Sequence, residues 1–178
     1  MTPDISGTDL TPRQLGYRWP AEWEPHAGTW IAWPHNEQTW PGEFTHLPPL
    51  FRQLIATLLQ WESVHLLASE PVIASQARDQ LQPLTTSTPH KLYWHNIATN
   101  DAWIRDFGPT FLVINFSEEA ASQPAGIDWL YNAWGGKYPP FELDQQASGA
   151  ILSELGAEQF HPAMAVSYTH LRAHETEA

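Results

Sequence analysis

Apolar residues along this chain form short runs whose spacing alternates between that of helices and that of strands. The strongest helical pattern covers residues 48–62, where two prolines suit the first turn. Four large apolar residues recur there at helical spacing: Leu50, Leu54, Leu58 and Trp61. A second helix is predicted over 71–81, with Ser69 as its N-terminal cap, and a third over 146–155.

Strand-like runs separate these helices. They cover residues 29–32, 64–67, 92–94, 110–115 and 127–131. The segments between them, rich in Pro, Trp and Gly, are expected to be loops. Because strands and helices alternate, the pattern predicts an α/β fold, and a length of 178 residues suits one domain. Residues 1–18 are expected to form a loosely draped arm that precedes it.

Charge and tryptophan content narrow the class of partner. The chain carries 8 basic and 20 acidic residues, a net charge of -12, which argues against a nucleic-acid partner. A negative field attracts cationic substrates, although the same charge also serves ordinary solubility. The 10 tryptophans offer flat faces suited to planar or cationic ligands.

Other classes of protein are disfavoured by what the sequence lacks. It has no cysteine, and therefore neither a disulfide framework nor a Cys-ligated metal. The N-terminus is polar and no apolar run reaches about 18 residues, so we expect a cytoplasmic chain without a membrane span. The oligomeric state stays open. Neither a metal nor another cofactor is expected, because seven histidines show no recognisable ligand spacing: His26, His35, His46, His65, His90, His95 and His161.

The densest chemistry lies in the segment NDAWIRDFGPTF, residues 100–111. A carboxylate such as Asp106 beside the indole of Trp103 is a good receptor for a guanidinium, through charge-assisted hydrogen bonds and cation–π attraction. The alternative is that Arg105 and Asp106 form local structural pairs while Trp103 belongs to the core.

Two further segments admit both a functional and a structural interpretation. The Trp-rich stretch 19–42 could supply a binding face or pack into the core, with Trp33 the strongest candidate for a wall of a site. The segment NAWGGK, residues 132–137, lacks the spacing of a phosphate-binding loop. Its glycine pair indicates a tight turn, or a loop at the rim of a pocket.

Three motifs, in their order and spacing, resemble one known family. They are RWPAEWEPHAGTWIAWPHNEQTWPG at 18–42, TNDAWIRDFGPTFLV at 99–113 and YNAWGGKYPPFELD at 131–144. The family is that of the agmatine deiminases and bacterial-type peptidylarginine deiminases, and the resemblance covers about residues 19–164. It implies a partial pentein, or β/α-propeller, made of roughly the first two of five ββαβ modules.

The resemblance also implies a reaction. Family enzymes hydrolyse a guanidinium to a ureido group and ammonia, so that agmatine becomes N-carbamoylputrescine or arginine becomes citrulline. A Cys thiolate attacks the guanidinium carbon, and a His protonates the departing ammonia and later activates water. By this resemblance Asp106 binds the substrate guanidinium and Trp103 packs along the substrate. Arginines that hold a substrate carboxylate in the peptidylarginine branch are missing from the 132–137 segment, which favours agmatine.

The chain departs from the family in length, since family members are about twice as long. Their Cys, His and second acid lie in later modules, so no catalytic residue is expected here. Residues 19–166 are thus interpreted as the N-terminal part of a guanidino-group hydrolase, inactive without its nucleophile. Residues 167–178 resemble a translated adaptor-like end and are expected to be non-native. The rival hypotheses are a non-catalytic module that binds cationic guanidino ligands, and a carbohydrate-binding domain.

Overall fold

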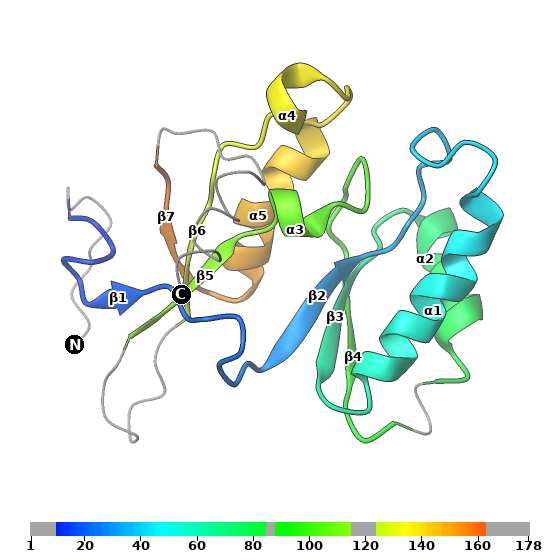
Figure 1. Ribbon diagram of the computed structural model, residues 1–178, viewed down its shortest axis with the longest axis horizontal. Coiled ribbons are helices and arrows are strands. Elements are labelled where there is room, and N and C mark those ends of the chain that lie inside the picture. Colours follow the sequence, from blue (N-terminus) through cyan, green and yellow to red (C-terminus); the bar gives the residue numbers. More distant parts are fainter. Residues whose placement is uncertain (1–9, 85–87, 115–123, 163–178) are drawn as a thin grey trace.

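The chain folds into two sheets that lie side by side, each with helices against it (Figure 1). The computed structural model describes residues 10–84, 88–114 and 124–162. This mixed α/β architecture agrees with the fold class expected from the alternating pattern.

The first sheet has the strand order β2-β3-β4, and both pairs of neighbours are parallel. Helices α1 and α2 cross over between these strands, as parallel pairing requires, and cover one face of the sheet (Figure 1). The elements are β2 (Gly28–Ala32), a 3-10 turn (Phe44–His46), α1 (Leu47–Leu58), β3 (Ser63–Leu67), α2 (Pro71–Leu81) and β4 (Leu92–His95).

The second sheet has the order β1-β5-β6-β7. β5 pairs antiparallel with β1 and β6, whereas β6 and β7 are parallel and joined through α5. Its elements are β1 (Tyr17–Arg18), β5 (Thr110–Ile114), β6 (Ala125–Ile127), α5 (Glu142–Glu154) and β7 (Glu158–Phe160), with two short helices, α3 (Ile104–Phe107) and α4 (Ala133–Gly136), in the connections.

Alternation along β2 directs its side chains into two different hydrophobic cores. Ile31 points toward the helices of the first sheet, where it joins Ile55 of α1 and Leu81 of α2. Ala32 points to the opposite face and joins a second cluster with Ile151 of α5. Helix α5 therefore packs against the first sheet as well as its own, and it links the two halves.

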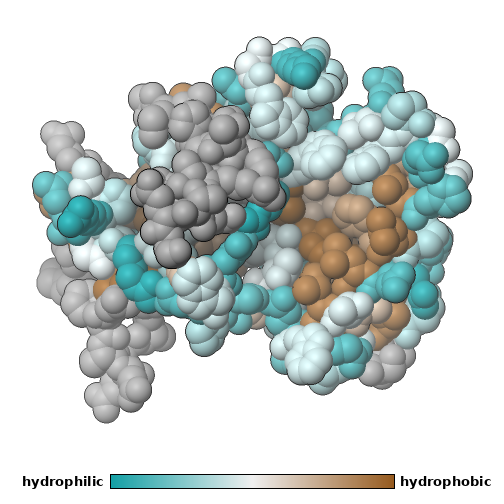
Figure 2. Space-filling model, viewed as in Figure 1, coloured by the Kyte–Doolittle hydropathy of each residue, from teal (hydrophilic) through white to brown (hydrophobic). Residues whose placement is uncertain are grey.

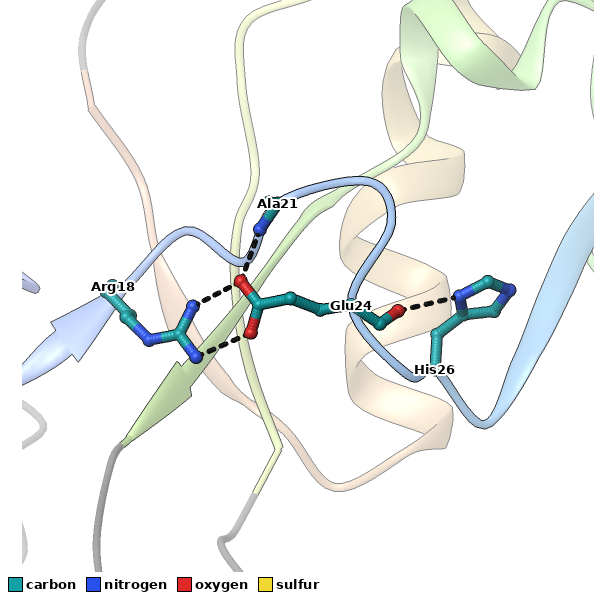
Figure 3. A network of polar contacts seen from close by, with 4 residues as sticks. All are labelled: Arg18, Ala21, Glu24 and His26. Atoms are coloured by element: carbon teal, nitrogen blue, oxygen red, sulfur yellow. Dashed lines mark hydrogen bonds and ion pairs between the residues drawn. The ribbon is translucent and has the colours of Figure 1, made fainter. Parts of the chain in front are cut away.

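Hydrogen bonds to one carboxylate stabilise the loop between β1 and β2. The Glu24 carboxylate accepts hydrogen bonds from Nη1 and Nη2 of Arg18, at 2.7 and 2.6 Å, and from the backbone N–H of Ala21, at 2.7 Å (Figure 3). The hydrogen bond from Arg18, then that from Ala21, lower the pKa of Glu24 to about 2. Tyr17 is buried beside β5, so Tyr17 and Arg18 belong to the sheet and not to the arm expected for residues 1–18.

Very short strands account for most differences from the predicted elements. β1 and β7 were not expected, because two or three residues are too few to show alternation. The strand predicted at 127–131 is instead β6 at Ala125–Ile127. The boundary expected at residues 166 and 167 lies outside the described residues.

Two helix starts also differ from the prediction. The residue that precedes α2 is Glu70, and its side chain makes no capping hydrogen bond, so the expected cap by Ser69 is wrong by one residue. Helix α5 begins four residues before the predicted start at 146. Its first turn is fixed by a distant contact, in which the Leu143 N–H donates to Asn100 Oδ1 at 2.9 Å.

The apolar stripe that predicted α1 is mostly its exposed face. Leu50, Leu54 and Trp61 are 57, 45 and 80% exposed, whereas Ile55 is fully enclosed. Figure 2 shows apolar surface on the half of the molecule that carries α1. The helix has two apolar faces, and only one of them packs on the sheet.

Neighbouring positions on α1 should therefore differ sharply in their contribution to stability. Ile55→Ala should lower the free energy of unfolding by about 2–5 kcal/mol, because it leaves a cavity in a closed core. Leu54→Ala, the matched control on the exposed face, should cost no more than about 1 kcal/mol. Urea unfolding of both variants measures this, and equal losses would contradict the assignment of faces.

Candidate functional site

The candidate site lies beyond the carboxyl ends of the parallel strands, where ligand sites of open α/β sheets usually form. The segments after β2 and after β4 emerge there and touch. The Thr39 hydroxyl donates to Asp101 Oδ2, and the indole of Trp40 stacks on that of Trp103 with ring centroids 5.3 Å apart. Two segments some sixty residues apart in sequence thus share one aromatic surface.

Trp103 introduces a single helical turn, α3, within the segment expected to be a loop. The Asp106 N–H donates to the Trp103 carbonyl at 2.9 Å, and Phe107 anchors the turn in the core. Gly108 ends it with an N–H bond to the Ile104 carbonyl at 2.7 Å. A Cβ at Gly108 would lie 2.5 Å from that same oxygen, so the close approach requires glycine.

Asp106 presents a partly buried carboxylate at this turn. Burial raises the pKa of Asp106, and the charge of neighbouring Arg105 only partly offsets the effect. Arg105 itself forms an ion pair with Glu22 at 2.5 Å. A carboxylate in this setting would gain from a cationic ligand.

A left-handed turn forms the opposite side of the cluster. In α4, Ala133 and Trp134 have φ angles of 48° and 56°, followed by Gly135 and Gly136 at 86° and 74°. Positive φ is uncommon for residues with a side chain, and such strain is concentrated at functional sites. Asn132 stabilises the turn, because its Oδ1 accepts the Gly135 N–H at 2.9 Å.

The left-handed turn directs Trp134 at the other aromatic side chains. Its ring meets Trp103 edge to face at 6.4 Å, Tyr131 at 6.0 Å and Tyr138 at 5.6 Å. Trp103 and Trp134 are each 36% exposed, so both keep a free surface next to their mutual contact. Lys137 lies over the Tyr138 ring at the rim, 5.3 Å from its centroid.

The charges of three carboxylates act on the buried Tyr131. Burial is the main cause that raises the pKa of Tyr131, and the charges of Asp144, Asp106 and Asp101 raise it further. The acids thus lie close enough to act on one hydroxyl, beside the aromatic surface. Flat indoles together with converging carboxylates form a receptor for a planar cation.

Asp144, in the first turn of α5, is the most enclosed of these acids, with 2% of its surface exposed. Its Oδ1 accepts two backbone N–H groups, from Asn100 at 2.7 Å and Asp101 at 3.2 Å. Burial nevertheless raises the pKa of Asp144 to about 6, because desolvation outweighs these two bonds.

The structure brings two of the three predicted site residues together. Trp103 and Asp106 lie in the cluster, whereas Trp33 is 1% exposed in the core beneath α1, against Phe51. So enclosed a side chain offers no surface to a ligand. Asp101 lies in the 100–111 segment that the sequence singles out, whereas four other members of the cluster were not named: Trp40, Tyr131, Trp134 and Asp144. The signals that covered them are the Trp-rich stretch 19–42, the motif at 131–144 and its glycine pair at 135–136, interpreted as a possible rim loop.

Within the ranges that the structure describes, no group of three or more His, Asp or Glu side chains is arranged to hold a metal ion. No helix in those ranges is long and apolar enough to cross a membrane.

The sequence profile of the Porphyromonas-type peptidyl-arginine deiminases matches residues 18–167. The chain therefore belongs to that family. It is 36% identical to the agmatine deiminase of Medicago truncatula over 149 residues, which are 80% of this chain and 38% of the relative.

Solved structures agree with this assignment. The agmatine deiminase of Enterococcus faecalis superposes with a TM-score of 0.73 at 27% identity, over 89% of this chain and 40% of that one. A C. jejuni agmatine deiminase, 20% identical, shares the fold with a TM-score of 0.68 over 85% of this chain and 41% of its own. The chain thus spans about two fifths of the length of these relatives, and the expected partial pentein fold is confirmed.

The raised pKa of Asp144 predicts a specific pH dependence of stability. Between about pH 4 and 6 the folded chain holds this proton more tightly than the unfolded chain, so its contribution destabilises the fold as pH rises through that window. Asp144→Asn keeps a hydrogen-bond acceptor without the charge. Relative to wild type, this variant should gain on the order of 2–3 kcal/mol of unfolding free energy from pH 4 to pH 7.

Urea unfolding at both pH values, with Asp79→Asn on exposed α2 as the control, tests this dependence. A stability difference between Asp144→Asn and wild type that does not change with pH would contradict it.

Proposed function

We propose that this chain supplies the guanidinium-binding part of a guanidino-group hydrolase whose substrate is agmatine. Water would convert agmatine to N-carbamoylputrescine and ammonia. The observation that carries the proposal is the position of the partly buried Asp106, one turn after Trp103, whose indole meets that of Trp134 edge to face. A guanidinium is planar and permanently charged, so it matches both parts of this surface.

The charge of the cluster and the names of relatives favour agmatine over a peptidyl arginine. The cluster holds three carboxylates, and among the described residues Arg105, paired with Glu22, and Lys137, at the rim, supply positive charge near it. A substrate that lacks a carboxylate avoids repulsion from these acids. The Medicago truncatula relative is named as an agmatine deiminase. The family as a whole is named for peptidyl-arginine, which remains the alternative substrate.

We infer that Asp106 orients the guanidinium through charge-assisted hydrogen bonds while the indoles hold it flat. In the whole protein a thiolate would attack the guanidinium carbon, and the departing nitrogen would leave as ammonia. The 178 residues contain no cysteine, so this chain should bind the substrate without converting it. The cytoplasm stays the predicted compartment.

Loss of the Asp106 charge should weaken agmatine binding selectively. Asp106→Asn removes one partner of a charge-assisted contact, worth about 1.5–3 kcal/mol, so affinity should fall about 10- to 100-fold. Isothermal titration of the 178-residue chain measures it. Asp79→Asn makes the same change of charge on α2, away from the cluster, and should leave affinity unaltered. Equal affinities of wild type and Asp106→Asn would refute the assigned role.

Ligand comparison separates the substrate classes. Agmatine should bind more tightly than arginine, which adds a carboxylate, and than putrescine, which lacks the guanidinium. Tighter binding of arginine would favour the peptidylarginine reaction instead.

An activity assay on the 178-residue chain tests whether it can hydrolyse agmatine without a cysteine nucleophile. Incubation with agmatine should release no ammonia above the rate without protein, because no thiolate is present. Saturable binding without turnover would also satisfy the rival hypothesis of a non-catalytic binding module. Measurable hydrolysis would show that another group of this chain attacks the guanidinium.

A further inference from the structure

The turn at residues 99–101, which leads into the candidate site, is held by side chains from two other segments. The Thr99 carbonyl accepts from His35 Nε2 at 3.0 Å. The next two backbone N–H groups, of Asn100 and Asp101, both donate to Asp144 Oδ1. Three consecutive residues thus have backbone groups bonded to His35 or Asp144.

The hold on this turn is reciprocal. Asn100 Oδ1 accepts the N–H of Leu143, which ties the turn to the start of α5 at a second point. Asp101 Oδ2 accepts the hydroxyl of Thr39, in the segment after β2. The turn is therefore clamped between α5 and the segment that carries Trp40.

His35 bridges two carbonyl oxygens. Its Nδ1 lies 2.9 Å from the Trp33 oxygen and its Nε2 lies 3.0 Å from the Thr99 oxygen. Carbonyl oxygens only accept, so a ring N–H is the donor in each of these bonds. A charge on His35 would also act favourably on Asp144, whose other charged neighbour is Asp101.

Only a few hydrogen bonds and residues separate the 99–101 turn from Trp103 and Asp106. Asp101 Oδ1 accepts the Ala102 N–H at 2.7 Å, and Trp103 follows directly. The Trp103 carbonyl then accepts the Asp106 N–H. A tilt of the turn would be transmitted to the indole and the carboxylate together, and small misplacements in a site have large effects.

We propose that Asp144 and His35 are positioning residues, which fix the 99–101 turn so that Trp103 and Asp106 face the guanidinium. The effect on the ligand rests on the proposed function, whereas the effect on the turn does not.

Hydrogen exchange and agmatine affinity, measured on the same variants of the 178-residue chain, test this proposal. Asp144→Ala should lower the protection of the Asn100 and Asp101 amides and weaken agmatine binding, each by about tenfold or more. Asp144→Asn keeps the acceptor oxygen and should restore amide protection and most of the affinity. Glu142→Ala, an exposed carboxylate in the same helical turn, should change neither.

Ile55→Val distinguishes positioning from general stability. It weakens the core between the first sheet and α1, so it should lower protection in β3 and leave agmatine affinity unchanged.

His35→Gln can bond only one of the two carbonyls well, and should weaken affinity less than Asp144→Ala. The proposal is overturned if Asp144→Ala leaves both amides as protected as wild type, or if Ile55→Val weakens agmatine binding equally. Absent binding by wild type would reject the proposed function, while the amides still decide the role of Asp144.

Discussion

Parallel pairing of β3 with β2 and β4 is the constraint on which the rest of the structure depends. It sends the segments after β2 and β4 out of the same edge of the sheet, where Trp40 can stack on Trp103. Helix α5 then closes the arrangement, because it packs against this sheet and also bonds the 99–101 turn through Asp144. Secondary structure alone would not bring these groups together, and the parallel register does.

The site combines two features that are unfavourable for stability. Ala133 and Trp134 adopt left-handed backbone angles, and Asp144 is a carboxyl buried strongly enough for its pKa to rise. Both features lie against the same aromatic cluster. Backbone strain and buried carboxyl groups persist where the surrounding structure holds them in place. Here the strained turn positions the Trp134 indole, and the buried carboxyl of Asp144 adds negative charge to the same small region. The acidic net charge of the chain adds attraction for a cation at longer range.

Local pattern determines the longer strands, with their β-branched and apolar runs, and the two helices that have proline in the first turn. These elements could therefore be predicted from the sequence. Short β1 and β7 could not, because their pairing partners are distant. For the site, local chemistry made Asp106 and Trp103 candidates within one motif but left local pairing and core packing open, and the family resemblance gave them their proposed roles. Trp33 is buried in the core and not exposed at a ligand site. Its position directly after a strand does not reveal from sequence whether a tryptophan lines a pocket or packs into the core. Asp144 could not be identified, since only the tertiary fold brings it to the backbone of Asn100 and Asp101, and the same fold exposes Tyr131 to the charges of three acids.

We expect agmatine to bind against the exposed surface of the indole cluster at the edge of the first sheet. An NMR titration of the 178-residue chain, read at the tryptophan indole N–H resonances, tests it most directly. The resonances of Trp40, Trp103 and Trp134 should shift saturably. Those of Trp23 and Trp61, which are 81 and 80% exposed but belong to other surfaces, should stay in place. Equal shifts of Trp23 and Trp61, or none in the cluster, would contradict the account.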